Sequence, residues 1–299
     1  MRTPPPLAVL ASRVRTEEKR IFAALEQRGA SYLHVDTRRF HTALTGGQRP
    51  GGPPYRAALS REISQSRALY AVRLLEASCV PTVNTAEVIA TCGDKLLSTV
   101  ALERAGVRTP RTVVALAPEA GLAAMEQIGY PVVVKPVAGS WGRLAALVRD
   151  PEAARTVLEH RAALPAPQQH VIYVQELIDK PGRDIRVIVV GGAVLGAIYR
   201  RAADWRTNVA RDAVAEPCPL TPELTAMAAA AAAAVAGPAA SPAAGGALGV
   251  DIAEDQEGRL YVLEVNHTVE FQGFQRAHGD RLDVAGAIVD HLLRQPVPV

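Results

Sequence analysis

The residues best suited to chemistry stand near the C-terminal end of the chain, in the stretch Leu260–Phe271. Its first half has the apolar, β-branched pattern of a strand, on which Glu264 and Asn266, two residues apart, point to the same side of a sheet. Asp251 lies on the preceding apolar run, Leu248–Ile252. Carboxylate and amide oxygens suit Mg²⁺ better than zinc. Two neighbouring strands are therefore expected to present these three side chains to one or two Mg²⁺ ions, although a strand that simply runs out into solvent explains a bare Glu-x-Asn at least as well.

A lysine followed by a glycine-rich turn indicates a second chemical site. The buried strand predicted over 130–136 ends in Lys135 and leads directly into a turn that contains Gly139, Ser140, Trp141, Gly142 and Arg143. Glycines let backbone N–H groups approach an anion, and an ammonium group neutralises it, so the segment is suited to phosphate. The lysine precedes the glycines, which excludes the P-loop motif. An ordinary turn beside a lysine that reaches solvent explains this segment alone equally well.

Arginines gather around a predicted hairpin. Strands are predicted over 171–178, 185–190 and 193–199, with Gly191-Gly192 as the turn between the last two. Around them stand Arg183, Arg186, Arg200, Arg201, Arg206 and Arg211. Charge clusters usually cover a solvated face. Arginines at strand ends are nevertheless well placed to hold phosphate or carboxylate through two hydrogen bonds.

Composition narrows the class of protein. With 299 residues the chain can bury a sizeable core and is expected to form two or three domains. No apolar run is long enough to span a bilayer, and the first residues lack the apolar core of a secretory signal. The three cysteines are widely spaced, which fits a reduced cytoplasm rather than a disulfide framework or a zinc site. The formal charge of +3 comes with only 4% aromatic residues and no run of Lys and Arg. We therefore expect a cytoplasmic protein that binds neither membrane nor nucleic acid, whereas a small acidic partner or a polyanionic cofactor fits.

The elements that must position these residues begin with a strand–helix–strand unit over 7–10, 16–28 and 32–35, which predicts a parallel sheet. The first strand is not followed by the G-x-G-x-x-G motif, so a dinucleotide-binding dehydrogenase is not expected. Further helices are predicted over 68–78, 94–105, 118–128, 221–236 and 283–293, and loops over 46–54 and 237–246. Just before the first of these helices, Ser66 and Arg67 are candidates for lining a cleft, although a helix-capping cluster is the simpler interpretation.

Taken in order, the motifs resemble those of the ATP-grasp enzymes. They are Asp94-Lys95, Val134-Lys135-Pro136, the turn 139–143, Gln175-Glu176, Gly182–Arg186, Tyr199-Arg200-Arg201, Asp251 and Glu264-x-Asn266. More narrowly, Cys92–Lys95, Gly139–Leu144 and Glu264–Phe271 resemble the LysX/ArgX branch of the RimK-like ligases, and the resemblance covers nearly the whole chain. It implies an α/β fold with an N-terminal domain over 1–92, a central ATP-grasp lobe over 93–174, and a C-terminal ATP-grasp lobe with the metal site over 175–299.

Members of that branch join the α-amino group of an amino acid to the side-chain carboxylate of the C-terminal glutamate of LysW, a small acidic amino-group carrier protein. ArgX types use glutamate and LysX types use 2-aminoadipate, and the choice follows a dipeptide that here reads Gly273-Phe274, as in ArgX types. A bulky Phe274 is expected to shorten the pocket by about a methylene, which supplies roughly 1–3 kcal/mol of discrimination. The resemblance thus implies glutamate first and 2-aminoadipate second, and a homo-oligomer, either dimer or tetramer.

The same resemblance implies a role for each group of residues. The nucleotide site would comprise Lys95, Lys135, the loop Gly139–Arg143, Gln175, Glu176, Leu177, Ile178, Asp184 and Arg186, and Mg²⁺ would lie on Asp251, Glu264 and Asn266. The acyl phosphate, formed when the carrier carboxylate attacks the γ-phosphate of ATP, would be stabilised by Arg200, Asn208 and Arg211. The substrate residues would be Thr268, Glu270, Gly273, Phe274, Ser66 and Arg67.

Two features depart from the family pattern. Asp212-Ala213 stands where the family usually has Gly-Gly, and the loop 237–246 is longer than usual. Two other interpretations also stay open: a RimK-like or D-Ala–D-Ala-type ligase with other substrates, and a nucleotide-binding regulatory module without catalysis. The segment His267–Phe271 argues against the first, and the intact set of metal ligands argues against the second.

Overall fold

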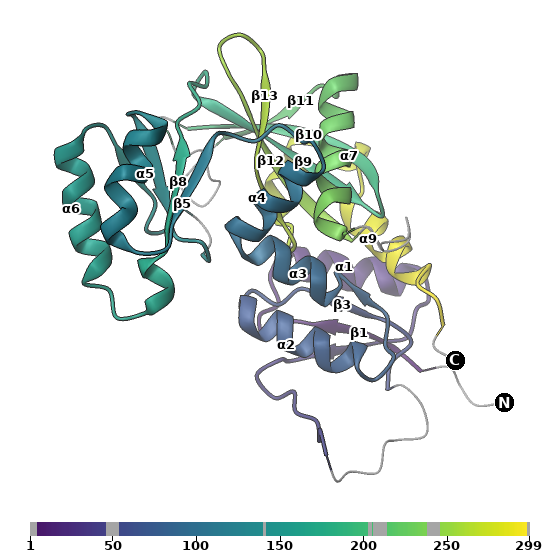
Figure 1. Cartoon of the computed structure of the whole chain (residues 1–299). Helices are drawn as coiled ribbons and strands as arrows, with labels where there is room; N and C mark the ends of the chain where they lie inside the picture. Colours follow the sequence, from purple (N-terminus) through teal and green to yellow (C-terminus); the bar gives the residue numbers. More distant parts are fainter. Residues whose placement is uncertain are drawn as a thin grey trace.

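Three β-sheets and the helices that cover them make up the computed structural model (Figure 1). It describes residues 5–45, 54–139, 142–202, 205, 214–237 and 246–297. The sheets follow one another along the chain and define an N-terminal domain, a central lobe and a C-terminal lobe. In Figure 1 the teal central lobe stands to one side of the other two.

The N-terminal domain is built on a parallel sheet in the order β2-β1-β3-β4. Its strands are β1 (Leu7–Leu10), β2 (Tyr32–Val35), β3 (Ala58–Ser60) and β4 (Thr82–Val83), and its helices are α1 (Thr16–Gln27), α2 (Gln65–Glu76) and α3 (Ala86–Gly93). β1 is apolar throughout and fully buried, as expected for a strand of a parallel sheet with both faces covered. The carboxyl ends of all four strands meet at one edge, which is where α/β sheets bind ligands.

The central lobe is an antiparallel sheet in the order β5-β8-β6-β7. Its strands are β5 (Thr112–Ala115), β6 (Val132–Lys135), β7 (Ala146–Val148) and β8 (Ile172–Glu176), and its helices are α5 (Gly121–Ile128) and α6 (Pro151–Ala162). The helices and one face of the sheet enclose a hydrophobic core that includes Met125, Val134 and Val174. The alternation of a strand turns Val133 and Lys135 to the other face, where they line a cavity.

The C-terminal lobe is a five-stranded antiparallel sheet in the order β11-β10-β9-β12-β13. Its strands are β9 (Arg183–Val190), β10 (Ala193–Arg201), β11 (Val214–Cys218), β12 (Ala247–Glu254) and β13 (Leu260–Asn266), and its helices are α7 (Pro222–Ala236), α8 (Gln272–His278) and α9 (Val284–Leu293). Helix α4 (Lys95–Arg104) packs against α7 and β13, so the N-terminal residue of α4 is brought to the end of this sheet.

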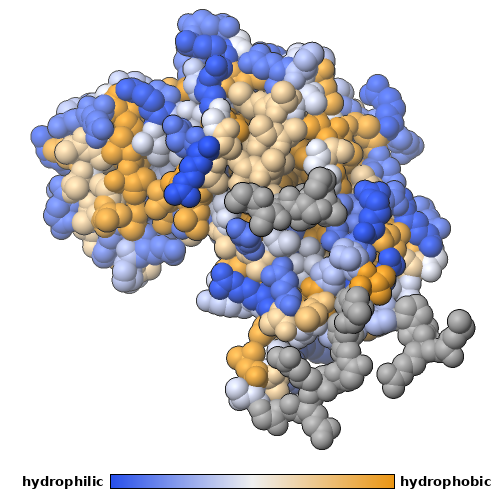
Figure 2. Space-filling view, turned by 45° about the vertical axis from the view of Figure 1, so that its right-hand side comes forward, coloured by the Kyte–Doolittle hydropathy of each residue, from blue (hydrophilic) through white to orange (hydrophobic). Residues whose placement is uncertain are grey.

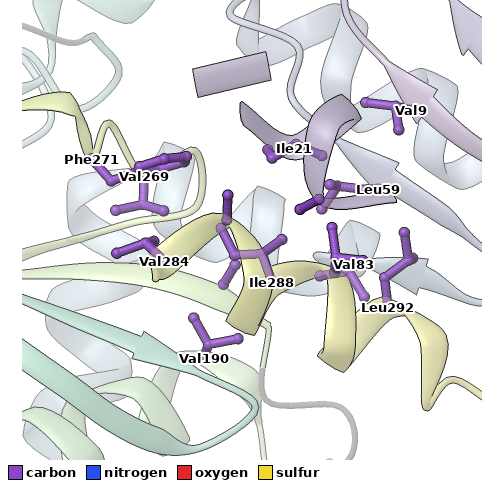
Figure 3. Close-up of a cluster of buried hydrophobic side chains, with 14 of the residues drawn as sticks. Val9, Ile21, Leu59, Val83, Val190, Val269, Phe271, Val284, Ile288 and Leu292 are labelled. Atoms are coloured by element: carbon purple, nitrogen blue, oxygen red, sulfur yellow. The ribbon is translucent and has the colours of Figure 1, made fainter. Parts of the chain in front are cut away.

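Helix α9 joins the N-terminal domain to the C-terminal lobe. Figure 3 shows Ile288 and Leu292 between Val9 and Ile21 on one side and Val190 on the other, and all five side chains are buried. Full burial of an aliphatic side chain of this size contributes about 1.5–3 kcal/mol. These two lobes therefore share one hydrophobic core, whereas the central lobe has a core of its own.

The elements around the ligand-binding motifs agree well with the sequence-based prediction. The strand–helix–strand opening, the parallel sheet and the helix that Thr221 caps are confirmed. The helix predicted over 68–78 begins earlier, after Ser64, and the one predicted over 118–128 begins as the 3₁₀ turn Pro118–Ala120. The elements β3, β4, α3, β7, α6, β11 and α8 were not predicted. All but α6 are eight residues or shorter, and α6 carried a start signal in Asp150-Pro151.

The expected boundary between the central and C-terminal lobes falls within one element. Residue 174 lies inside β8, which continues to Glu176 in hydrogen-bonded contact with β5 and β6. Residues 95–104, expected in the central lobe, form α4 and pack on the C-terminal lobe. The chain therefore crosses between lobes more often than a division into three consecutive segments implies.

Hydrophilic and hydrophobic residues are mixed on the face shown in Figure 2: a vertical hydrophobic band crosses the central lobe at the left, and a further, paler hydrophobic area lies over the middle of the molecule. Among the described helices, none combines the length and the apolar character needed to cross a bilayer.

Candidate active site

Two adjoining cavities lie between the lobes. The first, of about 120 Å³, lies between the exposed sheet face of the central lobe and strands β12 and β13. The second, of about 340 Å³, lies where the N-terminal domain meets the C-terminal lobe. Four residues line both cavities, and we refer to them as the shared wall: Lys95, Gly139, Arg200 and Glu264. A group held at the shared wall is within reach of molecules in both cavities.

The shared wall adjoins the oxygen ligands expected from the sequence. β12 and β13 are antiparallel neighbours, and Asp251 is paired directly with Glu264. The register shifts between Asp251 and Ile252, and this bulge lets Leu263 and Glu264 both line the first cavity although they are consecutive. Asn266 Nδ2 lies 3.1 Å from Glu264 Oε1 and 3.3 Å from Asp251 Oδ2. The three side chains therefore converge on one point.

Asp251 is also the centre of a buried charge cluster. Its carboxylate accepts hydrogen bonds from Arg186, and Arg200 Nη2 lies 3.2 Å from Asp251 Oδ1. Arg200 donates to both oxygens of Asp184, at 2.6 and 2.7 Å. Burial would raise the pKa of Asp251, but the charges and hydrogen bonds of the two guanidinium groups outweigh it and hold the pKa below its usual value. Burial would likewise lower the pKa of Arg200, but the two carboxylates raise it, so Arg200 stays protonated.

Of the three side chains expected to bind Mg²⁺, Glu264 is available directly and the other two require a rearrangement. The Glu264 side chain is 35% exposed and opens to both cavities. The Asn266 amide offers its oxygen to the same point after a flip of the amide, whose two ends coordinates alone do not distinguish. Asp251 would have to exchange one arginine contact for the cation. Within the described ranges no three His, Cys, Asp or Glu side chains group into a metal site, because the third donor here is an amide.

Two lysines face these oxygens. Lys95 Nζ lies 3.9 Å from Glu264 Oε2 and donates to Gly139 O at 2.9 Å. Lys135 donates to Gln175 Oε1 at 2.6 Å. Burial lowers the pKa of Lys135 to about 8, with the carboxylate of Glu264 opposing the shift and the charge of Lys95 adding to it. An anion between the two ammonium groups would offset both their repulsion and their desolvation.

The rest of the first cavity combines an apolar wall with polar edges. Leu177 and Ile178, just after β8, line it together with Leu263. Gln175 and Glu176 line the same side. This is the arrangement that a flat heteroaromatic ring requires: apolar contact with its faces and polar groups at its edge.

Two residues expected at the nucleotide are bound by other charged side chains. Asp184 lines the first cavity as expected, but both of its oxygens accept hydrogen bonds from Arg200, so its carboxylate is part of the charge cluster. Arg186 lines the second cavity and not the first, and it binds Asp251. The sequence pattern placed both near the site, but the partners of a buried charge follow from the pairing of β9, β10 and β12.

Four residues expected at the substrate do line the second cavity: Thr268, Glu270, Gly273 and Phe274. Phe274 is 1% exposed, and its ring lies 4.5 Å from that of His278 between ring centroids. A Cβ on Gly196 would lie only 2.9 Å from the Phe274 ring. Phe274 is therefore a rigid part of the cavity wall.

The residues of the second cavity that were missed include Arg15, Gln65, His267 and Arg276. Arg15 Nη1 lies 2.9 Å from Glu270 Oε1, and His267 Nε2 lies 2.5 Å from Gln65 Oε1. Burial lowers the pKa of His267 to about 4, so its ring is neutral at pH 7. His267 belongs to the motif Glu264–Phe271, so its place in the site could have been predicted from the sequence. Nothing in the sequence connects residues 15 and 65 to residues 264–276.

The remaining expected residues are not in these cavities or cannot be placed. Ser66 and Arg67 line neither cavity, and Arg67 Nη2 lies 3.3 Å from Glu62 Oε1. The residues Ser140, Trp141, Asn208 and Arg211 lie outside the described residues, as do Asp212-Ala213 and most of the loops 46–54 and 237–246. Their roles stay predictions.

Known proteins match this chain along almost its whole length. Residues 7–91 match the LysX preATP-grasp domain, and residues 92–292 match the RimK-like ATP-grasp domain. The glutamate–LysW ligase ArgX of Sulfolobus acidocaldarius is 34% identical over 294 residues, which cover 96% of this chain and 97% of that protein. The α-aminoadipate–LysW ligase LysX of Sulfurisphaera tokodaii is 29% identical over 273 residues, 91% of this chain and 93% of that protein. Among solved structures, the RimK-domain ATP-grasp protein of Sphaerobacter thermophilus has a TM-score of 0.78 at 29% identity and covers 96% of this chain and 99% of its own.

Proposed function

Since the chain belongs to the RimK-like ATP-grasp family, we propose that it is an ATP-dependent ligase acting on a LysW-type carrier protein. It joins the α-amino group of glutamate to the γ-carboxylate of the carrier's C-terminal glutamate and forms ADP and phosphate. The observation that carries the proposal is the shared wall, where Lys95, Arg200 and Glu264 border two cavities at once. Such a ligase needs a nucleotide on one side of the transferred phosphoryl group and an acceptor on the other.

ATP occupies the first cavity in this proposal. Its adenine lies against Leu177 and Ile178, and its phosphates lie between Lys135 and Lys95. Asp251, Glu264 and Asn266 would hold Mg²⁺, which would offset the negative charge of the phosphates. The two lysines orient the γ-phosphate toward the second cavity, where the carrier enters.

The chemistry proceeds in two steps at the shared wall. The carrier carboxylate attacks the γ-phosphorus, which gives an acyl phosphate and ADP. The amine of glutamate then attacks the acyl carbon, loses a proton and expels inorganic phosphate, which leaves an amide. Arg200 is held in a fixed, protonated state beside both steps and stabilises the phosphoryl oxygens. No covalent protein nucleophile takes part.

Glutamate is the preferred amino acid in this proposal because Phe274 closes one side of the second cavity. The dipeptide Gly273-Phe274 agrees with the ArgX pattern, and two ArgX relatives are 34% and 35% identical to this chain, against 29% to 33% for three LysX relatives. A longer dicarboxylic amino acid, 2-aminoadipate, is the second candidate. The same resemblance supports a homo-oligomer, either a dimer or a tetramer, which light scattering would test.

Intact-mass measurement of the carrier tests the proposal. The enzyme is mixed with carrier, ATP, Mg²⁺ and either glutamate or 2-aminoadipate, and the two adducts differ by one CH₂. We expect a glutamate adduct, together with one phosphate released per adduct. A carrier whose C-terminal glutamate is deleted serves as the control and should stay unmodified.

The rival interpretations give different results in the same experiment. A 2-aminoadipate adduct in excess would reverse the amino-acid assignment but keep the reaction. ATP hydrolysis that depends on another acceptor would indicate a RimK-like ligase with a different substrate. Nucleotide binding without turnover of any carrier and amino acid would indicate a regulatory module.

A further inference from the structure

Charged side chains divide the second cavity into an inner and an outer part. The cationic residues that line it are Arg15, Lys95, Arg186, Arg200 and Arg276. The inner three lie within 4.0 Å of carboxylates at the β12–β13 site described above. They are therefore already engaged in holding the catalytic groups in place.

The outer part contains the other two guanidinium groups. Arg15 is bound on both sides, because its Nη1 lies 2.9 Å from Glu270 Oε1 and its Nε and Nη2 each donate to Glu18 at 3.0 Å. Arg276 is exposed, and across the described ranges no hydrogen bond or ion pair joins it to another residue. A guanidinium group without an anion beside a cavity is suited to bind a carboxylate through two parallel hydrogen bonds.

Gly273 and Arg276 line the second cavity from the same helix, α8. Arg276 stands three residues after Gly273, so the two positions share one face of the helix. A Cβ at Gly273 would meet only Ala215 Cβ, at 3.6 Å, which is an ordinary contact. The fold therefore does not demand glycine at this position for packing.

The reaction proposed above creates a need for such a cation. The amine of the amino acid must reach the acyl carbon at the shared wall, so the carboxylates of the same molecule extend away from it into the outer part. An ionised carboxylate loses free energy on leaving water unless a charged or hydrogen-bonding partner meets it. We infer that Arg276 binds a carboxylate of the acceptor amino acid, an inference that rests on the proposed function.

Steady-state kinetics of Arg276→Gln test this inference. The substitution removes the charge but keeps the helix propensity of an exposed position. We expect the KM for glutamate to rise roughly 10- to 100-fold, the size expected for loss of a charge-assisted hydrogen bond. The KM values for ATP and for the carrier should stay unchanged. Arg20→Gln is the matched control, since Arg20 is an exposed arginine of α1 that lines neither cavity.

Two kinds of alternative acceptor make the test specific. Hydroxylamine has no carboxylate, so the rate at which it traps the acyl phosphate as a hydroxamate should be equal in Arg276→Gln and the unmodified enzyme. Glutamine lacks the side-chain carboxylate and γ-aminobutyrate lacks the α-carboxylate. Arg276→Gln should therefore no longer raise the KM for the analogue that lacks the carboxylate bound by Arg276, and that analogue identifies which carboxylate is bound.

Three results would overturn the inference: an unchanged KM for glutamate, an equal loss of rate with hydroxylamine, or a rise in the KM for the carrier instead. These differ from failure of the proposed function. If the unmodified enzyme forms no hydroxamate with ATP, Mg²⁺ and carrier, the proposed function and this inference fall together.

Discussion

Lys135 occupies its place in the first cavity at a cost in free energy that an anion would relieve. Burial lowers its pKa to about 8 from an ordinary value of 10.5. Below pH 8 the folded protein must keep a desolvated charge there, so this residue lowers stability most at low pH. As the pH rises from 8 to 10.5 the folded state binds fewer protons than the unfolded state at this site, and the penalty disappears.

The pH dependence of nucleotide binding follows from the same shift. ATP binds the protonated form of Lys135, so we expect the KM for ATP to rise as the pH passes about 8. Lys135→Arg keeps its charge throughout this range because an arginine pKa lies above about 12. The comparison is the KM for ATP between neutral and mildly alkaline pH in both proteins. A rise of equal slope in both would show that another group is responsible.

Phe274 is the residue that we expect to set the length of the amino acid. Phe274→Leu should raise the rate with 2-aminoadipate relative to glutamate by roughly 10-fold or more, since one methylene in an apolar pocket is worth about 1–3 kcal/mol. The measurement is the ratio of kcat/KM for the two amino acids. Phe271→Leu is the control, because Phe271 is equally buried in the same core but does not line the second cavity. If the ratio of kcat/KM for the two amino acids is the same in Phe274→Leu and Phe271→Leu, Phe274 does not determine the specificity.

At the scale of elements, the strand pair β12–β13 gives its two carboxylates different tasks. Asp251 is 3% exposed and lies between Arg186 and Arg200, whereas the side chain of Glu264 is 35% exposed and opens to both cavities. Removal of one partner from a buried ion pair leaves the other charge uncompensated. Both carboxylates are proposed magnesium ligands, but only Asp251 also holds the fold together.

Neutralising each carboxylate should separate these tasks. Asp251→Asn should lower the free energy of unfolding by about 3–5 kcal/mol. Glu264→Gln should leave the free energy of unfolding nearly unchanged. It should, however, abolish the rise in Tm that Mg²⁺ and ATP produce together. A ligand at 100 times its Kd raises the free energy of unfolding by about 2.7 kcal/mol. Urea unfolding and thermal unfolding with and without Mg²⁺ and ATP make the comparison. A normal nucleotide-dependent rise in Glu264→Gln would contradict the proposed metal site.

At the scale of the whole molecule, the N-terminal domain and the C-terminal lobe behave as one body around the second cavity. They share the core around α9, and Asn84 links them by side-chain hydrogen bonds to both backbone groups of Ala247 and to His267 O. Asn84 is 2% exposed, so these bonds are shielded from water. They fix the start of β12 and the residue that follows Asn266.

Asn84→Ala should therefore affect both stability and activity. Loss of these buried bonds should lower the free energy of unfolding by about 3 kcal/mol, and the freed backbone around His267 should lower kcat. Thr82→Val is the control, because the Thr82 hydroxyl bonds to Glu76 within the N-terminal domain. Thr82→Val should lower the free energy of unfolding, but it should not lower kcat under conditions in which the protein is folded. An Asn84→Ala protein with unchanged kcat would show that this link does not position the site.

Much of the site was predictable because its motifs are local. Glu264 and Asn266 belong to one strand, and Lys135 ends another, so alternation and strand ends indicated their direction. The elements that were missed are mostly short, and short elements are determined by what they pack against. α8 is an example, since it spans seven residues and takes its place from Phe274 in the common core.

By itself, the sequence determined which chemical groups the protein has and the family to which it belongs, because those depend on residue types at fixed spacing along the chain. The tertiary structure decided which of these groups are free to act. Whether Asp184 meets a ribose or an arginine, and whether Arg15 and Arg276 stand beside residues 268–274, depends on strand pairing and domain packing between residues far apart in the chain. Long-range contacts bring charges together, and the free energy of a buried charge depends on its neighbours in space, not on those in the sequence.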